Sequence, residues 1–349
     1  MNILQVVRRF GPVGGMERYV WELTRELAAM GHRVQVLCEK DLSGATLAGV
    51  EIHLLGAIRP KPRWLSHIRF SKRAHNWIDQ HHQADMIIHS HERLQDHHIT
   101  TFHGPPFAQI CDQAVWKRLS LRAAMNLWLE RRELLAPQVQ RIVPNSIHIA
   151  EQLKACYPAI ASRLTTPVVP GVTPCPKRPD RAIAANAGVI GFVGKEWKRK
   201  GLEMAIDIIS KLHETRPKLK FVVVGPSPES IRHLFSEATF NYELLGEIDA
   251  RELYQQFDLL LHPAEKEPFG MVITEALSAG VPVVISDVCG AITEVKGFNG
   301  DVLSLNAPLG KWANTIDSRL ERGEIAITYE RSWREVATEY ERVYKQIKP

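Results

Sequence analysis

Residues 259–284 read Leu259-Leu260-Leu261-His262-Pro263-Ala264-Glu265-Lys266-Glu267-Pro268-Phe269-Gly270-Met271-Val272-Ile273-Thr274-Glu275-Ala276-Leu277-Ser278-Ala279-Gly280-Val281-Pro282-Val283-Val284. The apolar run at the start predicts a buried parallel strand, and the loop after it carries Glu267. A helix is expected to begin near Phe269, because Pro268 stands where a missing N–H costs little. Gly280 ends that helix, and the run from Pro282 predicts the next strand.

Two glutamates of this stretch flank the predicted helix N-terminus. Glu267 and Glu275 follow the carboxyl end of a parallel strand, where open α/β sheets bind ligands and where free backbone N–H groups favour phosphate. Eight helical residues would span ~12 Å, so two carboxylates could hold hydroxyls on either side of a phosphate group. A nucleoside diphosphate sugar has that distribution of hydroxyls and charge. The alternative is a solvated helix face, which is the usual role of two such glutamates.

The block from Glu267 to Val284 closely resembles the signature of retaining glycosyltransferases of family 4 (glycosyltransferase group 1). The resemblance implies an α/β protein with the GT-B fold, in which two Rossmann-like doubly wound domains face each other across a cleft. It implies that Glu267 holds the donor-sugar hydroxyls and Glu275 the ribose. The turn between them, Phe269-Gly270-Met271, would bind the donor through backbone amides.

Length and composition fit two globular domains. The 349 residues suggest roughly two domains of ~150 residues, and 45% hydrophobic with 24% charged residues is typical of a soluble chain. The sequence has no apolar run of ~20 residues and no signal-peptide pattern at Met1. Five scattered cysteines without a C-x-x-C pair favour a reducing compartment. We therefore expect a cytoplasmic protein, with peripheral attachment to the inner face of the inner membrane as a further hypothesis.

Short apolar runs alternate with helical patterns in both halves, which predicts βαβ units and parallel doubly wound sheets. The expected strands are 3–7, 33–38, 50–55, 85–89, 99–102, 141–144, 188–193, 220–224, 242–245, 259–262 and 283–286. Besides the helix near Phe269 and a helical region at 108–136, helices are expected at 17–30, 202–215 and 333–347. Proline spacing marks a linker at 174–187 between an acceptor-side domain (1–173) and a nucleotide-sugar domain (188–328). The resemblance implies that the last helix (329–349) packs back on the first domain.

Positive charge is concentrated in the first half. Residues 1–173 carry 21 Lys/Arg against 14 Asp/Glu, a net charge of +7, whereas residues 174–349 carry 23 against 25, a net charge of −2. A solvated basic face is one interpretation. The other is an anionic partner, either a membrane surface or a phosphorylated glycolipid; nucleic acid is not favoured, because no reading module accompanies the charge. The basic residues gather at Arg59, Lys61, Arg63, Arg69, Lys72 and Arg73, and at Lys117, Arg118, Arg122, Arg131 and Arg132.

Two features of the first half match the family's donor site. Gly14 and Gly15 open a predicted helix after the first strand, in a loop expected to start at Arg8; a plain βα turn is the alternative, and the pattern is not the dinucleotide fingerprint. His103 stands at the carboxyl end of a predicted strand, where it could simply be a strand-end imidazole. The resemblance implies that the glycines lie against the donor diphosphate and that His103 contacts the transferred sugar.

Histidines crowd the segment from His89 to His98, but consecutive residues at a strand end point in opposite directions and no helical H-x-x-x-H spacing occurs. We assign them structural or acceptor-lining roles and expect no metal or other cofactor, since D-x-D is absent as well. Residues 108–136 form a basic amphipathic helical region. Trp116 in it is either a core residue or a contact to a membrane surface.

A cationic loop follows the first predicted strand of the second half. Lys195, Arg199 and Lys200 open a helix, a position that favours a diphosphate over a solvated turn. Lys200-Gly201 matches the family, whereas Lys195 stands where the family usually has arginine and lacks bidentate capacity. Arg199 could supply the guanidinium, as in the branch that builds lipopolysaccharide core.

The resemblance implies transfer of a hexose from a nucleoside diphosphate sugar, with UDP-glucose as the favoured donor, to a glycan or glycolipid acceptor, with retention at the anomeric carbon. Lipopolysaccharide core or another cell-surface polysaccharide is the expected product. Two rival classes remain: a GT-B enzyme that acts on sugar nucleotides without a glycan acceptor, such as an epimerase, and a non-enzymatic glycan- or anion-binding protein.

Overall fold

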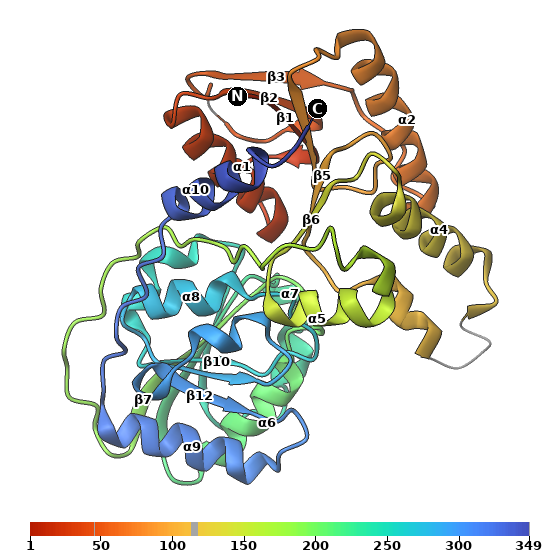
Figure 1. Ribbon diagram of the computed structural model, residues 1–349. Coiled ribbons are helices and arrows are strands. Elements are labelled where there is room, and N and C mark those ends of the chain that lie inside the picture. Colours follow the sequence, from red (N-terminus) through yellow and green to blue (C-terminus); the bar gives the residue numbers. More distant parts are fainter. Residues whose placement is uncertain (45, 113–117, 349) are drawn as a thin grey trace. The chain divides into compact units, whose positions relative to one another are not determined.

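The computed structural model describes residues 1–44, 46–112 and 118–348 (Figure 1). The chain divides into two compact units, one formed by Met1–Gly171 with Ser332–Pro349 and the other by Val172–Arg331. The first unit is therefore discontinuous in sequence, because it contains both the start of the chain and its last helix, α10 (Trp333–Tyr344). No helix in the described ranges is both long enough and apolar enough to cross a membrane.

The first unit is built on a six-stranded parallel sheet with the order β3-β2-β1-β4-β5-β6. Its strands are β1 (Asn2–Phe10), β2 (Arg33–Asp41), β3 (Val50–Leu54), β4 (Met86–Ser90), β5 (Ile99–Phe102) and β6 (Arg141–Pro144). Besides α10, its helices are α1 (Gly15–Ala29), α2 (Arg63–His81), α4 (Leu121–Leu135) and α5 (Ile147–Cys156).

Helices cover both faces of this sheet. Alternate residues of a strand point to opposite faces, so Val6 of β1 packs in the cluster that contains Phe70 of α2. Val7, the next residue, packs in a separate cluster with Val20 of α1. The central strands β4 and β5 are buried along their whole length because both faces are covered, whereas the edge strand β3 is partly exposed.

The second unit repeats the architecture with the order β12-β11-β10-β7-β8-β9, again all parallel. Its core packs Phe192 of β7 with Ile208 of α6 and Trp312 of α9. The strands are β7 (Ala187–Val193), β8 (Lys218–Val224), β9 (Asn241–Gly246), β10 (Leu259–His262), β11 (Val283–Ser286) and β12 (Gly300–Leu303). The helices are α6 (Leu202–His213), α7 (Pro228–Ile231), α8 (Met271–Ser278) and α9 (Leu309–Arg322).

Several sequence expectations need correction. The loop expected from Arg8 begins only at Gly11, because β1 continues to Phe10 through pairing with β2. The helical region 108–136 is not one helix: a 3-10 helix covers Phe107–Asp112, and Ser120 caps a separate α4 by accepting a hydrogen bond from Ala123 N at 3.1 Å. Trp116 and Lys117 lie outside the described residues. Helix α2 and strand β12 were not expected.

Candidate functional site

The strand order places two loops of the second unit together. Neighbouring strands β7 and β10 are the point at which the sheet order reverses, and open α/β sheets bind ligands at that point, beyond the carboxyl ends of the strands. The loop after β7 carries Lys195, Arg199 and Lys200, and the loop after β10 carries Glu267. Sequence-distant candidates are thereby brought to one edge of the sheet.

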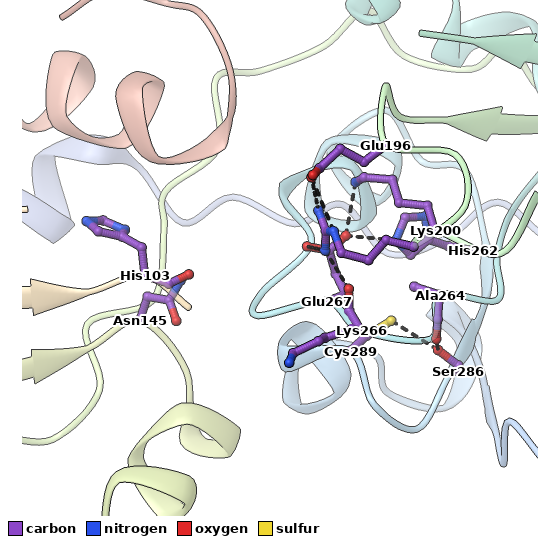
Figure 2. A network of polar contacts seen from close by, with 11 residues as sticks. His103, Asn145, Glu196, Lys200, His262, Ala264, Lys266, Glu267, Ser286 and Cys289 are labelled. Carbon is purple, nitrogen blue, oxygen red and sulfur yellow. Dashed lines mark hydrogen bonds and ion pairs between the residues drawn. The ribbon is translucent and has the colours of Figure 1, made fainter. Parts of the chain in front are cut away.

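Glu267 is the centre of a buried polar network (Figure 2). The residue is 7% exposed, and Lys200 Nζ donates to its Oε2 at 3.0 Å. Arg199 Nη1 lies 3.6 Å from Oε1, and His262 Nε2, at the end of β10, lies 3.3 Å from Oε2. One carboxylate therefore contacts two cations and one imidazole.

The electrostatics of the network favour an ionised carboxylate. Burial alone would raise the pKa of Glu267, but Lys200, His262 and Arg199 outweigh it and hold the pKa well below its usual range. Burial lowers the pKa of His262, so that this imidazole is neutral and donates through Nε2–H. The carboxylate can accept hydroxyl hydrogen bonds while the cations beside it attract phosphate oxygens.

The side chain of Lys200 crosses directly over Gly194, the residue that follows β7. Gly194 has φ of +152°, and a Cβ there would lie 2.1 Å from Lys200 Cδ. Only glycine at this position leaves Lys200 room to reach Glu267. Arg199 is held in the same loop, since it donates to Lys266 O and to Glu196 Oε2, the latter at 2.6 Å.

Lys195 is placed differently from the other two cations. It forms an exposed ion pair with Glu247 rather than a contact with Glu267. Exposed pairs of this kind contribute little to stability, so Lys195 stays available to an anion at low energetic cost.

Helix α8 carries the second glutamate. Glu275 is 7% exposed and accepts a hydrogen bond from Tyr254 Oη at 2.9 Å. The helix begins at Met271, two residues later than expected, and its N-cap Gly270 has φ of +99°. A Cβ at Gly270 would meet Ile273 Cδ1 at 2.7 Å and Glu267 Cγ at 3.1 Å, so glycine allows the turn to fold close to Glu267. Phe269 before it is buried.

A third segment fixes the turn and was missed by sequence reasoning. Gly290 N donates to Glu267 O at 2.9 Å, and Ala291 N donates to Phe269 O at 2.9 Å. A Cβ at Gly290 would lie 1.9 Å from Pro268 O. The available signal was a glycine in the loop after β11, four residues beyond the end of that strand. His262 was also not predicted as a site residue, and its signal was its position at the carboxyl end of β10.

The remaining candidates belong to the first unit. Gly14 is the N-cap of α1 with φ of +73°, and Gly15 is the first residue of that helix. His103 directly follows β5, and its Nε2 lies 2.8 Å from His91 Nδ1. Its ring meets the ring of Tyr19 on α1 edge-on at 5.0 Å. The structure thus places His103 near the helix that Gly14 and Gly15 open.

Burial lowers the pKa of His103 to about 3, so the ring is neutral near pH 7. Its backbone carbonyl accepts from Asn145 Nδ2 at 3.4 Å (Figure 2). Within the described residues, no group of three or more His, Cys, Asp or Glu is arranged to hold a metal ion. The crowded histidines hydrogen-bond to other side chains and to backbone instead, as His91 does with His103.

Comparison with known proteins adds two family matches. Residues 13–172 match the family model described as glycosyltransferase family 4, and residues 187–321 match the model described as glycosyl transferases group 1. Among curated proteins, the chain is 36% identical over 118 residues to the lipopolysaccharide glucosyltransferase WaaG of Escherichia coli K12, which covers 32% of each chain. It is 30% identical over 205 residues to a D-inositol 3-phosphate glycosyltransferase of Mycobacterium sp. strain KMS, covering 53% of this chain and 46% of that protein. These matches span less than half the length of the curated relatives.

Solved structures share the fold over the whole chain. WaaG, a glycosyltransferase involved in lipopolysaccharide biosynthesis, superposes with a TM-score of 0.78 at 19% identity, covering 99% of both chains. HepE of Anabaena in complex with UDP superposes with a TM-score of 0.66 at 16% identity, covering 99% of this chain and 100% of that one. The two matched family models and the two six-stranded parallel sheets lead to one conclusion: the chain belongs to the group 1 glycosyltransferases of family 4 and has the GT-B fold.

Proposed function

We propose that this protein transfers a hexose from a UDP-sugar, with UDP-glucose as the first candidate, to a glycan or glycolipid acceptor with retention at the anomeric carbon. The observation that carries the proposal is the buried Glu267 carboxylate in contact with Lys200 and Arg199, two cations that lower its pKa. Carboxylate and cations together match a ligand that joins hydroxyls to a diphosphate. Family membership supports glycosyl transfer as the reaction class. The structures of HepE with UDP and with UDP-glucose support uracil as the nucleotide base of the donor.

In the proposed reaction the bond between the anomeric carbon and the diphosphate breaks, and charge develops on the departing phosphate oxygens. Arg199, Lys200 and the N-terminus of α8 would stabilise that charge. Glu267 would hold donor-sugar hydroxyls, Glu275 the ribose, and His103 the transferred sugar. Gly14, Gly15 and the backbone at Gly270 would lie against the donor. The departing phosphate would take the acceptor proton, so that the bond to the acceptor oxygen forms on the face that the phosphate leaves.

The direct test is incubation with UDP-glucose, UDP-galactose and GDP-mannose, with nucleotide release measured in the absence and presence of oligosaccharide acceptors. A transferase releases UDP slowly to water and faster when an acceptor is present. Interconversion of nucleotide sugars without release would indicate the epimerase-like alternative, and binding without turnover would indicate a non-enzymatic protein. Proton NMR of the product made from an α-linked donor reports retention through an α linkage.

We further propose that turnover needs no metal cofactor, because the chain lacks D-x-D and its own cations stand beside the proposed diphosphate site. Activity should survive treatment with EDTA followed by gel filtration. Loss of activity that Mg²⁺ or Mn²⁺ restores would contradict this part of the proposal.

We propose an anionic membrane surface as the partner of α2. Arg63, Lys72 and Arg73 of this helix are exposed, and a basic surface is attracted to acidic phospholipid. The fraction of protein that sediments with phosphatidylglycerol vesicles should decrease as the salt concentration rises. It should also decrease when Arg63, Lys72 and Arg73 are all changed to glutamate. The same changes at exposed basic residues of α9, Lys311 and Arg322, are the control. Failure to bind at low salt would contradict the proposal.

A further inference from the structure

A continuous hydrogen-bond network runs through the first unit and ends at His103. Apart from His103, its side chains are at most 5% exposed, so water does not interrupt it. We call it the His103 network; its members, in order of contact, are the Val168 carbonyl, Tyr19, Tyr340, Thr101, His89, Tyr344, Gln5, His91 and His103.

The first part of the network consists of hydroxyl groups. Tyr19 Oη can donate its one proton either to Val168 O at 3.1 Å or to Tyr340 Oη at 2.9 Å. Tyr340 Oη lies 2.6 Å from Thr101 Oγ1, and either hydroxyl can be the donor. The direction of the network is therefore set further along, at Gln5, whose amide nitrogen only donates and whose amide oxygen only accepts.

The direction set at Gln5 fixes the tautomer of His89. Burial holds the pKa of His89 well below its usual range, so the ring is neutral and carries one proton. Tyr344 Oη accepts from Gln5 Nε2 and donates its own proton to His89 Nδ1 at 2.7 Å. The ring proton of His89 therefore lies on Nε2, which donates to Thr101 Oγ1 at 2.8 Å.

Gln5 of β1 links Tyr344 of α10 to His91, which in turn contacts His103. The Tyr344 oxygen accepts from Gln5 Nε2 at 3.1 Å, and this orientation of the amide turns Gln5 Oε1 toward His91 Nε2 at 2.8 Å. His91 Nε2 must carry a proton, since two facing lone pairs would repel. Burial also lowers the pKa of His91, so its Nδ1 is an acceptor and receives His103 Nε2–H at 2.8 Å.

We propose that Gln5, His91, Tyr340 and Tyr344 are positioning residues that hold His103 as the Nε2–H tautomer and so present its Nδ1 as a hydrogen-bond acceptor. No described residue donates to that Nδ1, and His103 is partly exposed. The inference rests on the proposed function, in which His103 contacts the transferred sugar. An unprotonated Nδ1 selects a ligand hydroxyl, which can donate, over a phosphate oxygen, which cannot.

The first test reads the tautomer directly in the unaltered protein. Nitrogen-15 spectra of histidine-labelled protein, with the His103 signals assigned by their loss in His103→Gln, distinguish protonated from unprotonated ring nitrogens. We expect a protonated Nε2 and an unprotonated Nδ1 for His103 near pH 7. A protonated Nδ1 would overturn the inference whatever the enzyme does.

The second test breaks the network away from His103. Tyr344→Phe removes the hydroxyl that orients both Gln5 and His89, so the His103 signals should become those of a tautomer mixture and KM for the donor should rise about two- to tenfold. Tyr157→Phe is the matched control, because Tyr157 Oη donates to Glu130 at 2.8 Å outside the network. An unchanged His103 spectrum in folded Tyr344→Phe would contradict the inference. If this variant does not fold, the spectrum of the unaltered protein still decides the tautomer.

The last arm separates this inference from the proposed function. UDP-glucose should shift the His103 Nδ1 signal, whereas UDP alone should leave it in place. If His103 has the expected tautomer but UDP-glucose does not shift its Nδ1 signal, the proposed contact between His103 and the sugar is wrong, and the direction assigned to the His103 network stands. If UDP-glucose shifts the signal but His103 has the other tautomer, the sugar contact stands and the direction assigned to the network is wrong.

Discussion

Lys200 Nζ lies 3.0 Å from Glu267 Oε2, although 67 positions separate the two residues in the sequence. Each side chain comes from the loop after one of two adjacent parallel strands, β7 and β10. The ion pair thus joins the proposed phosphate-binding loop to the proposed sugar-binding loop at the point where the strand order reverses. A substitution that separates the two side chains should weaken donor binding while the packing of the hydrophobic core stays intact.

Lys200→Ala should lower turnover of the donor by about 10²-fold, because it removes a cation that would face the departing diphosphate. Lys198→Ala is the control, since Lys198 is an exposed lysine of the same loop that lies over the Trp197 ring at 5.1 Å. Steady-state UDP release from UDP-glucose measures both. Equal losses in the two variants would show that the loop's general charge matters and not this contact.

Gly194→Ala should reproduce the loss of Lys200 without any change at Lys200 itself. The new Cβ would occupy the path of the lysine side chain, which must leave Glu267 to make room. Gly310→Ala in α9 is the control, because a Cβ there has no neighbour within 4 Å. The measurement is donor affinity by calorimetry together with thermal unfolding. Unchanged donor affinity in folded Gly194→Ala would show that donor binding does not need Lys200 in its observed position.

Glu275→Ala should nearly abolish turnover while the fold persists, because Glu275 lies in the proposed ribose subsite; the substitution also removes the acceptor of the 2.9 Å hydrogen bond from Tyr254 Oη. The matched change is Glu321→Ala, an exposed glutamate of α9. Circular dichroism checks the fold and UDP release checks activity. A Glu275→Ala variant with an unchanged rate would refute the assigned site.

Glu133 provides a prediction about pH. Burial raises its pKa to about 8, against the opposing effects of Arg93 and of the hydrogen bond from Thr100. The pKa of Glu133 in the folded state lies above its unfolded-state value of about 4.3. Protonated Glu133 therefore contributes its full stabilisation below a pH of about 4.3, and this contribution is lost as the pH rises toward 8. The unfolding free energy of the parent should therefore fall relative to Glu133→Gln between pH 5 and pH 8 in urea. Exposed Glu151→Gln should show no such trend; a parallel dependence in all three proteins would contradict the assignment.

Strands buried on both faces could be predicted closely from sequence. The expected bounds of β5, β6, β10 and β11 are those observed, because each is a short run ended by a turn residue or by the loop that carries the site. Strand β12 was missed because Gly300 and Asp301 interrupt its apolar pattern. Helix α2 was missed because the basic residues that cover it were interpreted only as a charged surface.

The candidate site could be predicted where its residues are contiguous or follow neighbouring strands. Lys200 and Glu267 were both expected beyond strand ends, and the structure brings them together. The contact between His91 and His103 was not predicted, because it depends on β4 lying beside β5 and on which ring nitrogens face each other. Nothing in the sequence indicated that Tyr340 and Tyr344 would share that network.

The return of α10 to the first unit has a consequence for synthesis of the protein. A ribosome completes all strands of the second unit before it makes Trp333, so Val172–Arg331 can reach its final form while the first unit still lacks a helix. Until α10 arrives, Tyr19 of α1 and His89 of β4 lack their tyrosine partners, and the surface that α10 covers faces water. The half translated first is therefore finished last, and the nascent chain is most open to chaperones and proteases at that surface.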